Sequence, residues 1–317
     1  MIRRALVPLI AVCAALGVGI ALGGGPLSDR GSAETTAGAA GKSHDDHLAQ
    51  DRAGQKLAAA TAPLLISGKL AGKQVAVLAL PGAPSTVVDA IAGQVGAAGG
   101  VVASTVHVTS TATDPGNKSL VDTLGSQMAT QVQGVVDGTQ PPYVRLGQLL
   151  GAAVATTGTS AAPSADQATT LATLAESRLV TMADPGQTGT PSGTASTATT
   201  QPSAATSTRA SIQSTAPLVL IVLGDHVDPT ILAGIVQGAA TRAHGVVVAG
   251  STGSGLRGDL KRLRAADLGA QKPTVATVDG DETNIGQLGA VLALAHQITG
   301  GGGAYGASGI DGVAPLG

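Results

Sequence analysis

The chain has 317 residues but no phenylalanine and no tryptophan, and its only aromatic residues are Tyr143 and Tyr305. The core of a folded domain must therefore be built from Ala, Val, Leu and Ile, each of which buries less area than an aromatic ring. A chain of this length can supply enough of these smaller side chains to compensate.

Cysteine and charge are scarce as well. The single cysteine, Cys13, lies in an apolar run near the N-terminus, which excludes an intramolecular disulfide. Only 12% of the residues are charged and the net charge is −2. These values argue against nucleic-acid binding, which requires a concentrated basic surface. Such sparse charge is more typical of an anchored or wall-associated protein.

The N-terminus has the pattern of an export signal that stays attached. Arg3 and Arg4 precede eighteen uncharged residues, Ala5–Leu22, which as a helix span about 27 Å, enough to cross a hydrocarbon core. The arginines should stay in the cytoplasm, so the rest of the chain is exported. We therefore predict a signal-anchor transmembrane helix in residues 1–27 and a membrane-anchored protein of the cell envelope, with inner and outer membrane both open. Cleavage near Ala21-Leu22-Gly23 is the alternative.

Two segments share a strand–helix–strand pattern. In the first, the apolar run Val75–Leu80 is followed by apolar residues at helical spacing and by a second apolar run, Val101–Thr109. In the second, a strand at Leu218–Leu223 is followed by Asp228-Pro229, which is typical of a helix start, and by a strand at Val246–Ala249. Short, continuously apolar strands joined by helices indicate a parallel sheet that is buried on both faces.

The remaining pattern completes one α/β domain. We predict further strands at Leu179–Met182 and Thr274–Val278, and helices at Lys118–Gln133, Val144–Ala155, Gln167–Glu176, Leu256–Ala265 and Ile285–Ile298. The predicted fold class is α/β: a single N-terminal transmembrane helix followed by a Rossmann-like, mostly parallel, three-layer sheet domain of about six strands. We expect the chain to divide into the signal-anchor (1–27), a polar stalk (28–68), the first part of the domain (69–184), a disordered Thr/Ser/Pro insertion (185–215), the second part of the domain (216–299) and a Gly-rich tail (300–317).

The order of these parts resembles a known family. The segments GKLAGKQVAVLALPGA, AGQVGAAGGVVASTVHVT and VVVAGSTGSG are followed by ATVDGDETNIGQLGAVLALAHQITGGGGAYG. Together they resemble the actinobacterial copper-transport outer-membrane protein family over most of residues 69–306. The best local signature is Val275–Asp279, then the helix Gly286–Leu294 and Tyr305-Gly306. The resemblance implies a contribution to copper efflux or homeostasis, with a part in a channel as one form of it.

Copper is held in proteins by thiolates, thioethers or histidines, and this chain has few of them. The best cluster is His44-Asp45-Asp46-His47 in the stalk. On a helix, His44 and His47 would share one face and could chelate a metal ion with a carboxylate nearby. The alternative is a solvated, charged stretch of stalk.

Two loops follow strands of the second unit, where open α/β sheets place ligands. Asp225 and His226 come directly after the first of these strands. Ser251 and Ser254 lie in a glycine-rich loop after the second strand, where backbone N–H groups could hold an anion. Together they form the predicted ligand loop. In each case the alternative is structural: a polar loop residue, a helix cap or a flexible turn.

The sequence contains no catalytic motif, so we predict a protein that is not an enzyme and has no cofactor, with a copper ion as the possible exception. The expected partners are the membrane and either further copies of the chain or other envelope proteins, with no nucleic acid. The leading hypothesis is copper efflux or homeostasis, as the resemblance implies. The alternative is a non-enzymatic cell-envelope scaffold or ligand-binding domain.

Overall fold

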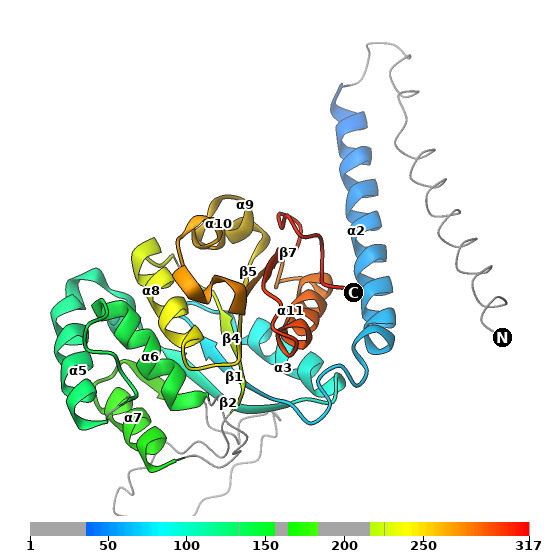
Figure 1. The fold of residues 1–317 in the computed structure, drawn as a ribbon. Coiled ribbons are helices and arrows are strands. Elements are labelled where there is room, and N and C mark those ends of the chain that lie inside the picture. The colour runs from blue at the N-terminus through cyan, green and yellow to red at the C-terminus, as the bar shows by residue number, and fades with distance from the viewer. Residues whose placement is uncertain (1–35, 133, 156–163, 183–215, 225, 317) are drawn as a thin grey trace, which may run out of the picture. The chain divides into compact units, whose positions relative to one another are not determined.

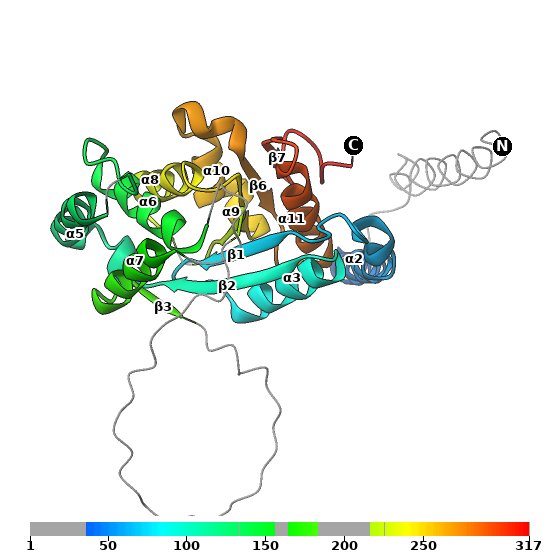
Figure 2. The ribbon, with the colours of Figure 1, turned by 60° about the horizontal axis from the view of Figure 1, so that its bottom comes forward.

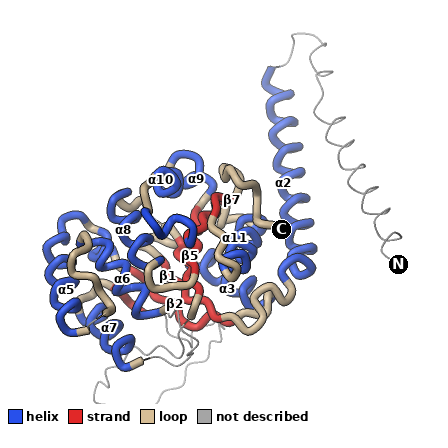
Figure 3. The backbone as a smooth tube through the Cα atoms, viewed as in Figure 1, coloured by secondary structure: helices blue, strands red, loops and turns tan. Residues whose placement is uncertain are grey.

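The computed structural model describes residues 36–132, 134–155, 164–182, 216–224 and 226–316. The chain divides into two compact units, Met1–Ala53 and Gly54–Gly317. The second unit is built on a seven-stranded sheet with helices on both faces (Figures 1 and 3).

The strands are β1 (Gln74–Ala79), β2 (Val101–Val108), β3 (Val180–Met182), β4 (Leu218–Val222), β5 (Gly245–Gly250), β6 (Val275–Asp279) and β7 (Gly303–Tyr305). The helices are α2 (Thr36–Ile66), α3 (Ser85–Ala97), α4 (Ser110–Thr113), α5 (Lys118–Gln131), α6 (Pro142–Val154), α7 (Ala165–Glu176), α8 (Pro229–Ala240), α9 (Thr252–Arg257), α10 (Asp259–Ala265) and α11 (Asn284–Gln297). Two short 3-10 turns, η2 (Pro115–Asn117) and η3 (Gly269–Thr274), complete the described elements.

The strand order in the sheet is β3-β2-β1-β4-β5-β6-β7. Every neighbouring pair is parallel except β2 and β3, which are antiparallel. Both predicted strand–helix–strand units are present, as β1-α3-β2 and β4-α8-β5. The chain direction across the sheet reverses between β1 and β4, which is the topological switch point of this kind of sheet.

The core has two parts, one on each face of the sheet. Helices α5, α6, α7, α8 and α10 bury apolar residues on one face, while α3, α11 and the C-terminal part of α2 do so on the other. Figure 2 shows α3 running beside β1 and β2. Apart from Met128 and the two tyrosines, the buried apolar side chains are aliphatic, as the composition requires.

Helices α6 and α8 touch through their backbones. Gly147 and Gly151 on α6 face Gly234 and Gly238 on α8. A Cβ atom added at Gly238 would lie 2.0 Å from the carbonyl oxygen of Val144. No larger residue fits there without moving one helix away from the other.

The predicted fold class is wrong on two points. The sheet has seven strands instead of about six, because β7 lies in the segment predicted as a glycine-rich tail. In addition, no helix among the described residues combines the length and the apolar character needed to cross a membrane. At 31 residues α2 is long enough, but it carries charged residues such as Asp51 and Arg52. The predicted spanning stretch, Ala5–Leu22, and the tract 185–215 lie outside the described residues.

Candidate functional site

The loops that follow β4, β5 and β6 lie side by side at the carboxyl edge of the sheet, because these strands are neighbours and parallel. The switch point itself is filled by backbone. A Cβ atom on Gly224 would lie 1.9 Å from the nitrogen of Ala83, in the turn after β1. Leu80 N–H also donates to the Val222 carbonyl at 2.9 Å. The polar side chains therefore gather beyond the switch point, after β4, β5 and β6.

His226 is an exposed member of this group of polar residues. Its side chain is 66% exposed, and its Nδ1 lies 2.6 Å from Oδ1 of Asp259, whose side chain is only 9% exposed. The other carboxylate oxygen of Asp259 accepts a hydrogen bond from Val227 N–H at 2.9 Å. Asp259 Oδ1 also accepts from Arg262 at 3.2 Å, so Asp259 fixes the imidazole, a guanidinium and the backbone beside them. The second ring nitrogen of His226, Nε2, has no hydrogen-bond partner among the described residues.

Ser251 and Ser254, the other described residues of the predicted ligand loop, cap helices. Ser251 Oγ accepts from Ser254 N–H at 3.1 Å and caps α9. Ser254 Oγ accepts from Leu260 N–H at 3.1 Å, at the start of α10. Both hydroxyls therefore cap helices, which was the structural alternative to ligand binding in the sequence analysis. Asp225 lies outside the described residues.

The glycine-rich loop binds a carboxylate of the protein itself, the side chain of Glu282. Both carboxylate oxygens of Glu282 lie 3.1 Å from Thr252 N, at the first residue of α9. A negative charge at this position interacts favourably with the helix dipole. The loop therefore binds the turn that follows β6.

Beside Glu282 lies a buried carboxyl group that the sequence analysis did not select. Asp281 is 4% exposed, and its Oδ2 has no hydrogen-bond partner within the described structure. Burial, chiefly, and the negative charge of Glu282 raise the pKa of the Asp281 carboxyl from 3.8 to about 7, against a smaller opposing effect of the Glu282 backbone N–H. This group therefore changes charge near neutral pH.

The family signature forms a buried ion-pair network. The Asp279 side chain, at the end of β6, is fully buried against Arg264 of α10, with an N–O distance of 2.8 Å. Arg264 also donates to Thr277 Oγ1, Ser308 Oγ and the Tyr305 carbonyl at 2.7 to 2.9 Å. Asp279, Tyr305 and Arg264 together thus hold the C-terminal segment onto β6.

The close packing of this network explains the glycine after Tyr305. A Cβ atom on Gly306 would lie 2.5 Å from an Asp279 carboxylate oxygen, and Gly306 has a φ of +103°. Both the space and the backbone conformation therefore require glycine there. The signature residues have structural roles that account for their pattern.

The stalk histidines are placed only by their backbone. His44 and His47 both lie in α2, three residues apart as predicted, but their side chains are outside the described part. Across the described residues, no three His, Cys, Asp or Glu side chains come together in an arrangement that could hold a metal ion. The chelating pair remains a prediction.

Asp259 is the partner that the sequence analysis missed. It lies 33 residues from His226, in the middle of a segment predicted as one helix, Leu256–Ala265. The chain instead forms α9 and α10, with Gly258 between them. A Cβ atom on Gly258 would lie 2.8 Å from the Cα of Ser254, so this glycine allows the tight break that turns Asp259 toward His226.

Comparison with known proteins gives a consistent result. Residues 1–315 match the family described as "Copper transport outer membrane protein, MctB". Proteins named "Copper transporter MctB" from Mycobacterium tuberculosis and Mycobacterium bovis are each 29% identical to this chain over 324 residues, which covers 95% of the chain and 93% of the relative. The resemblance seen in the sequence is confirmed: the chain belongs to the copper transport outer membrane protein family.

Proposed function

We propose that this protein acts in copper transport or homeostasis at a membrane of the cell envelope. The observation that carries the proposal is the family match over residues 1–315. Relatives named as copper transporters align with nearly the whole chain, so the likeness extends well beyond a shared fold. A non-catalytic role is proposed because the matching family and the relatives are described as copper transport proteins.

Within the domain, His226 is the proposed copper contact. A carboxylate bonded to one ring nitrogen of a histidine orients the ring and makes the other nitrogen a better metal ligand, an arrangement that recurs in metalloproteins. Asp259 is in that position, and the ring it holds is exposed. A single imidazole offers a weak and exchangeable contact, which suits the passing on of a copper ion.

The function is tested by deleting the gene and measuring cellular copper and copper sensitivity. We expect copper to accumulate and tolerance to fall, with both restored by the wild-type gene. Zinc sensitivity, measured in parallel, should stay unchanged. Normal copper content with an altered envelope would contradict the proposal and favour the envelope scaffold.

The contact is tested separately, by NMR of the purified full-length protein during titration with Cu(II). The ring signals of His226 should broaden at lower copper than those of His244, an exposed histidine before β5 at the amino end of the strands. Asp259→Asn should weaken this selectivity. Equal broadening of both histidines would count against His226 as the preferred contact.

A further inference from the structure

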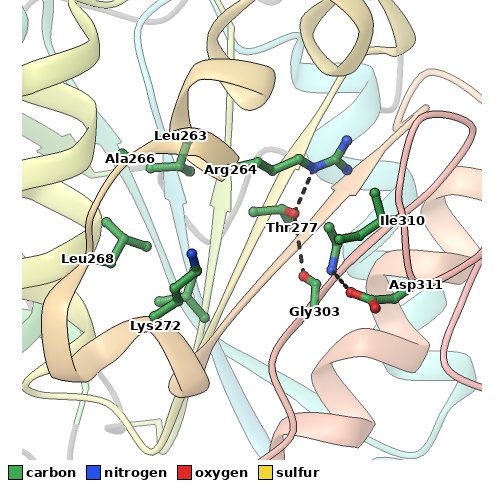
Figure 4. A pocket seen from close by; sticks show the side chains of 11 residues that line it. Leu263, Arg264, Ala266, Leu268, Lys272, Thr277, Gly303, Ile310 and Asp311 are labelled. Carbon is green, nitrogen blue, oxygen red and sulfur yellow. Dashed lines mark hydrogen bonds between the residues drawn. The ribbon is translucent and has the colours of Figure 1, made fainter.

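A cavity lies over β6 and β7, away from the carboxyl edge that carries His226. Its volume is about 230 Å³. Figure 4 shows Leu263, Ala266, Leu268 and Lys272 on one side of it, with Thr277, Gly303, Ile310 and Asp311 on the other. Val275 and Gly303 are the first residues of their strands, so the cavity extends toward the amino ends. It is therefore a second site, distinct from the predicted ligand loop.

Most of the cavity wall is aliphatic, and one aliphatic residue in it, Ile310, is exposed to solvent. Ile310 is 92% exposed although it lines the cavity. The next residue fixes it there, because Asp311 N–H donates to the Ala304 carbonyl at 2.9 Å and Asp311 Oδ2 accepts from Ala304 N–H at 2.8 Å. A ligand that covered Ile310 would remove apolar surface from water without moving the backbone, which favours binding.

The two cationic residues that line the cavity differ in whether they could pair with a ligand. Arg264 is committed to Thr277, Asp279, Ser308 and the Tyr305 carbonyl, so its guanidinium serves the fold. Lys272 is exposed, and within the described residues it takes part in no ion pair. Asp311 also lines the cavity, on the side opposite Lys272, and its Oδ2 is bonded to Ala304 N–H. A ligand would therefore meet apolar walls, the ammonium group of Lys272 on one side and the Asp311 carboxylate on the other.

We propose that this cavity binds a small organic anion with a compact apolar body and one carboxylate. The body would pack against Leu263, Leu268 and Ile310, and the carboxylate would pair with Lys272. The volume lies below the roughly 300–1,000 Å³ typical of drug-sized ligands, which favours a short acyl chain or a single ring. Copper is a poor candidate because Arg264 and Lys272 are both cationic, so the site is separate from the proposed copper function.

The test uses hexanoate as the probe and its neutral amide, hexanamide, as the matched ligand. Binding is followed by methyl NMR of Leu263, Leu268 and Ile310 in the full-length protein. We expect saturable shifts with hexanoate and about three- to fivefold weaker binding of hexanamide, the effect of one exposed ion pair. Lys272→Gln should remove the preference for the carboxylate. Lys261→Gln, an exposed lysine of α10 outside the cavity, should leave it unchanged.

A second variant tests the location. Ala266→Phe places a ring in the cavity and should abolish the shifts caused by hexanoate. Absence of saturable shifts, equal affinity for the two probes, or unaltered binding to Ala266→Phe would each overturn the proposal. Lys272→Gln changes only an exposed side chain, so the charge test stands even if the phenylalanine variant fails to fold. None of these outcomes bears on copper, which is measured independently.

Discussion

Asp281 provides the sharpest test of the electrostatics at the carboxyl edge. Its carboxyl group is buried, one of its oxygens has no hydrogen-bond partner among the described residues, and its pKa is raised to about 7. Replacing it with asparagine keeps the shape of the side chain and removes the charge. The change should therefore stabilise the protein when the carboxyl is ionised and matter much less when it is protonated.

The sign and size follow from linkage between proton binding and folding. The pKa of the Asp281 carboxyl is about 7 in the folded protein, against 3.8 for an exposed carboxyl. Below 3.8 the group is protonated in both states and costs the folded state nothing. The unfolding free energy therefore falls as the pH rises from about 3.8 to 7, and the loss is complete above the folded-state pKa. Each pH unit between the two pKa values is worth about 1.4 kcal/mol. Between pH 4.5 and 7.5 the wild type should lose roughly 3 kcal/mol that Asp281→Asn retains.

The assay is urea unfolding of full-length wild type and Asp281→Asn at several pH values. The difference in unfolding free energy should grow by roughly 3 kcal/mol in favour of the variant across this range. Asp89→Asn, at an exposed position of α3, is the control and should show no such growth. A difference that stays constant with pH would refute the reasoning.

Three further predictions concern the same framework. Glu282→Gln should lower the pKa of Asp281, seen as a shift of its ¹³C carboxyl titration by NMR; an unshifted titration would show that the two charges are not coupled. Arg264→Met should cost about 3–5 kcal/mol in urea unfolding because it leaves Asp279 charged and buried, and a loss below about 1 kcal/mol would contradict this. Gly238→Ala should destabilise by about 2 kcal/mol or more, whereas Gly93→Ala on α3, where a Cβ meets nothing within 4 Å, should stabilise by about 0.5–1 kcal/mol; thermal unfolding separates the two cases.

The parts of the fold that were predicted correctly have strong local signals. β1, β4 and β5 are continuous apolar runs because they are buried on both faces. The Asp228-Pro229 pair starts α8, and Asp228 accepts from Thr230 N–H at 2.8 Å as an N-cap should. Elements that are determined by contacts between residues close in the chain can therefore be predicted from the sequence.

The parts that were missed depend on distant contacts. β7 has three residues in a glycine-rich run, and it is a strand because β6 pairs with it. The spacing of the facing glycines in α6 and α8 does not distinguish them from other glycines of the sequence. Only the packing of the two helices shows that Cβ atoms at these positions would collide with the neighbouring helix. The candidate site follows the same rule: His226 was selected from its position after a strand, while Asp259 acquires its role only when α10 folds back beside it.

We propose that the protein handles copper and that His226 is the residue that contacts it. The most direct measurement is cellular copper in a deletion strain complemented with wild type, His226→Ala or His244→Ala, with equal protein levels verified. Wild type and His244→Ala should restore normal copper, and His226→Ala should leave it elevated. Full restoration by His226→Ala would contradict the assigned contact, and normal copper in the uncomplemented strain would contradict the copper function itself.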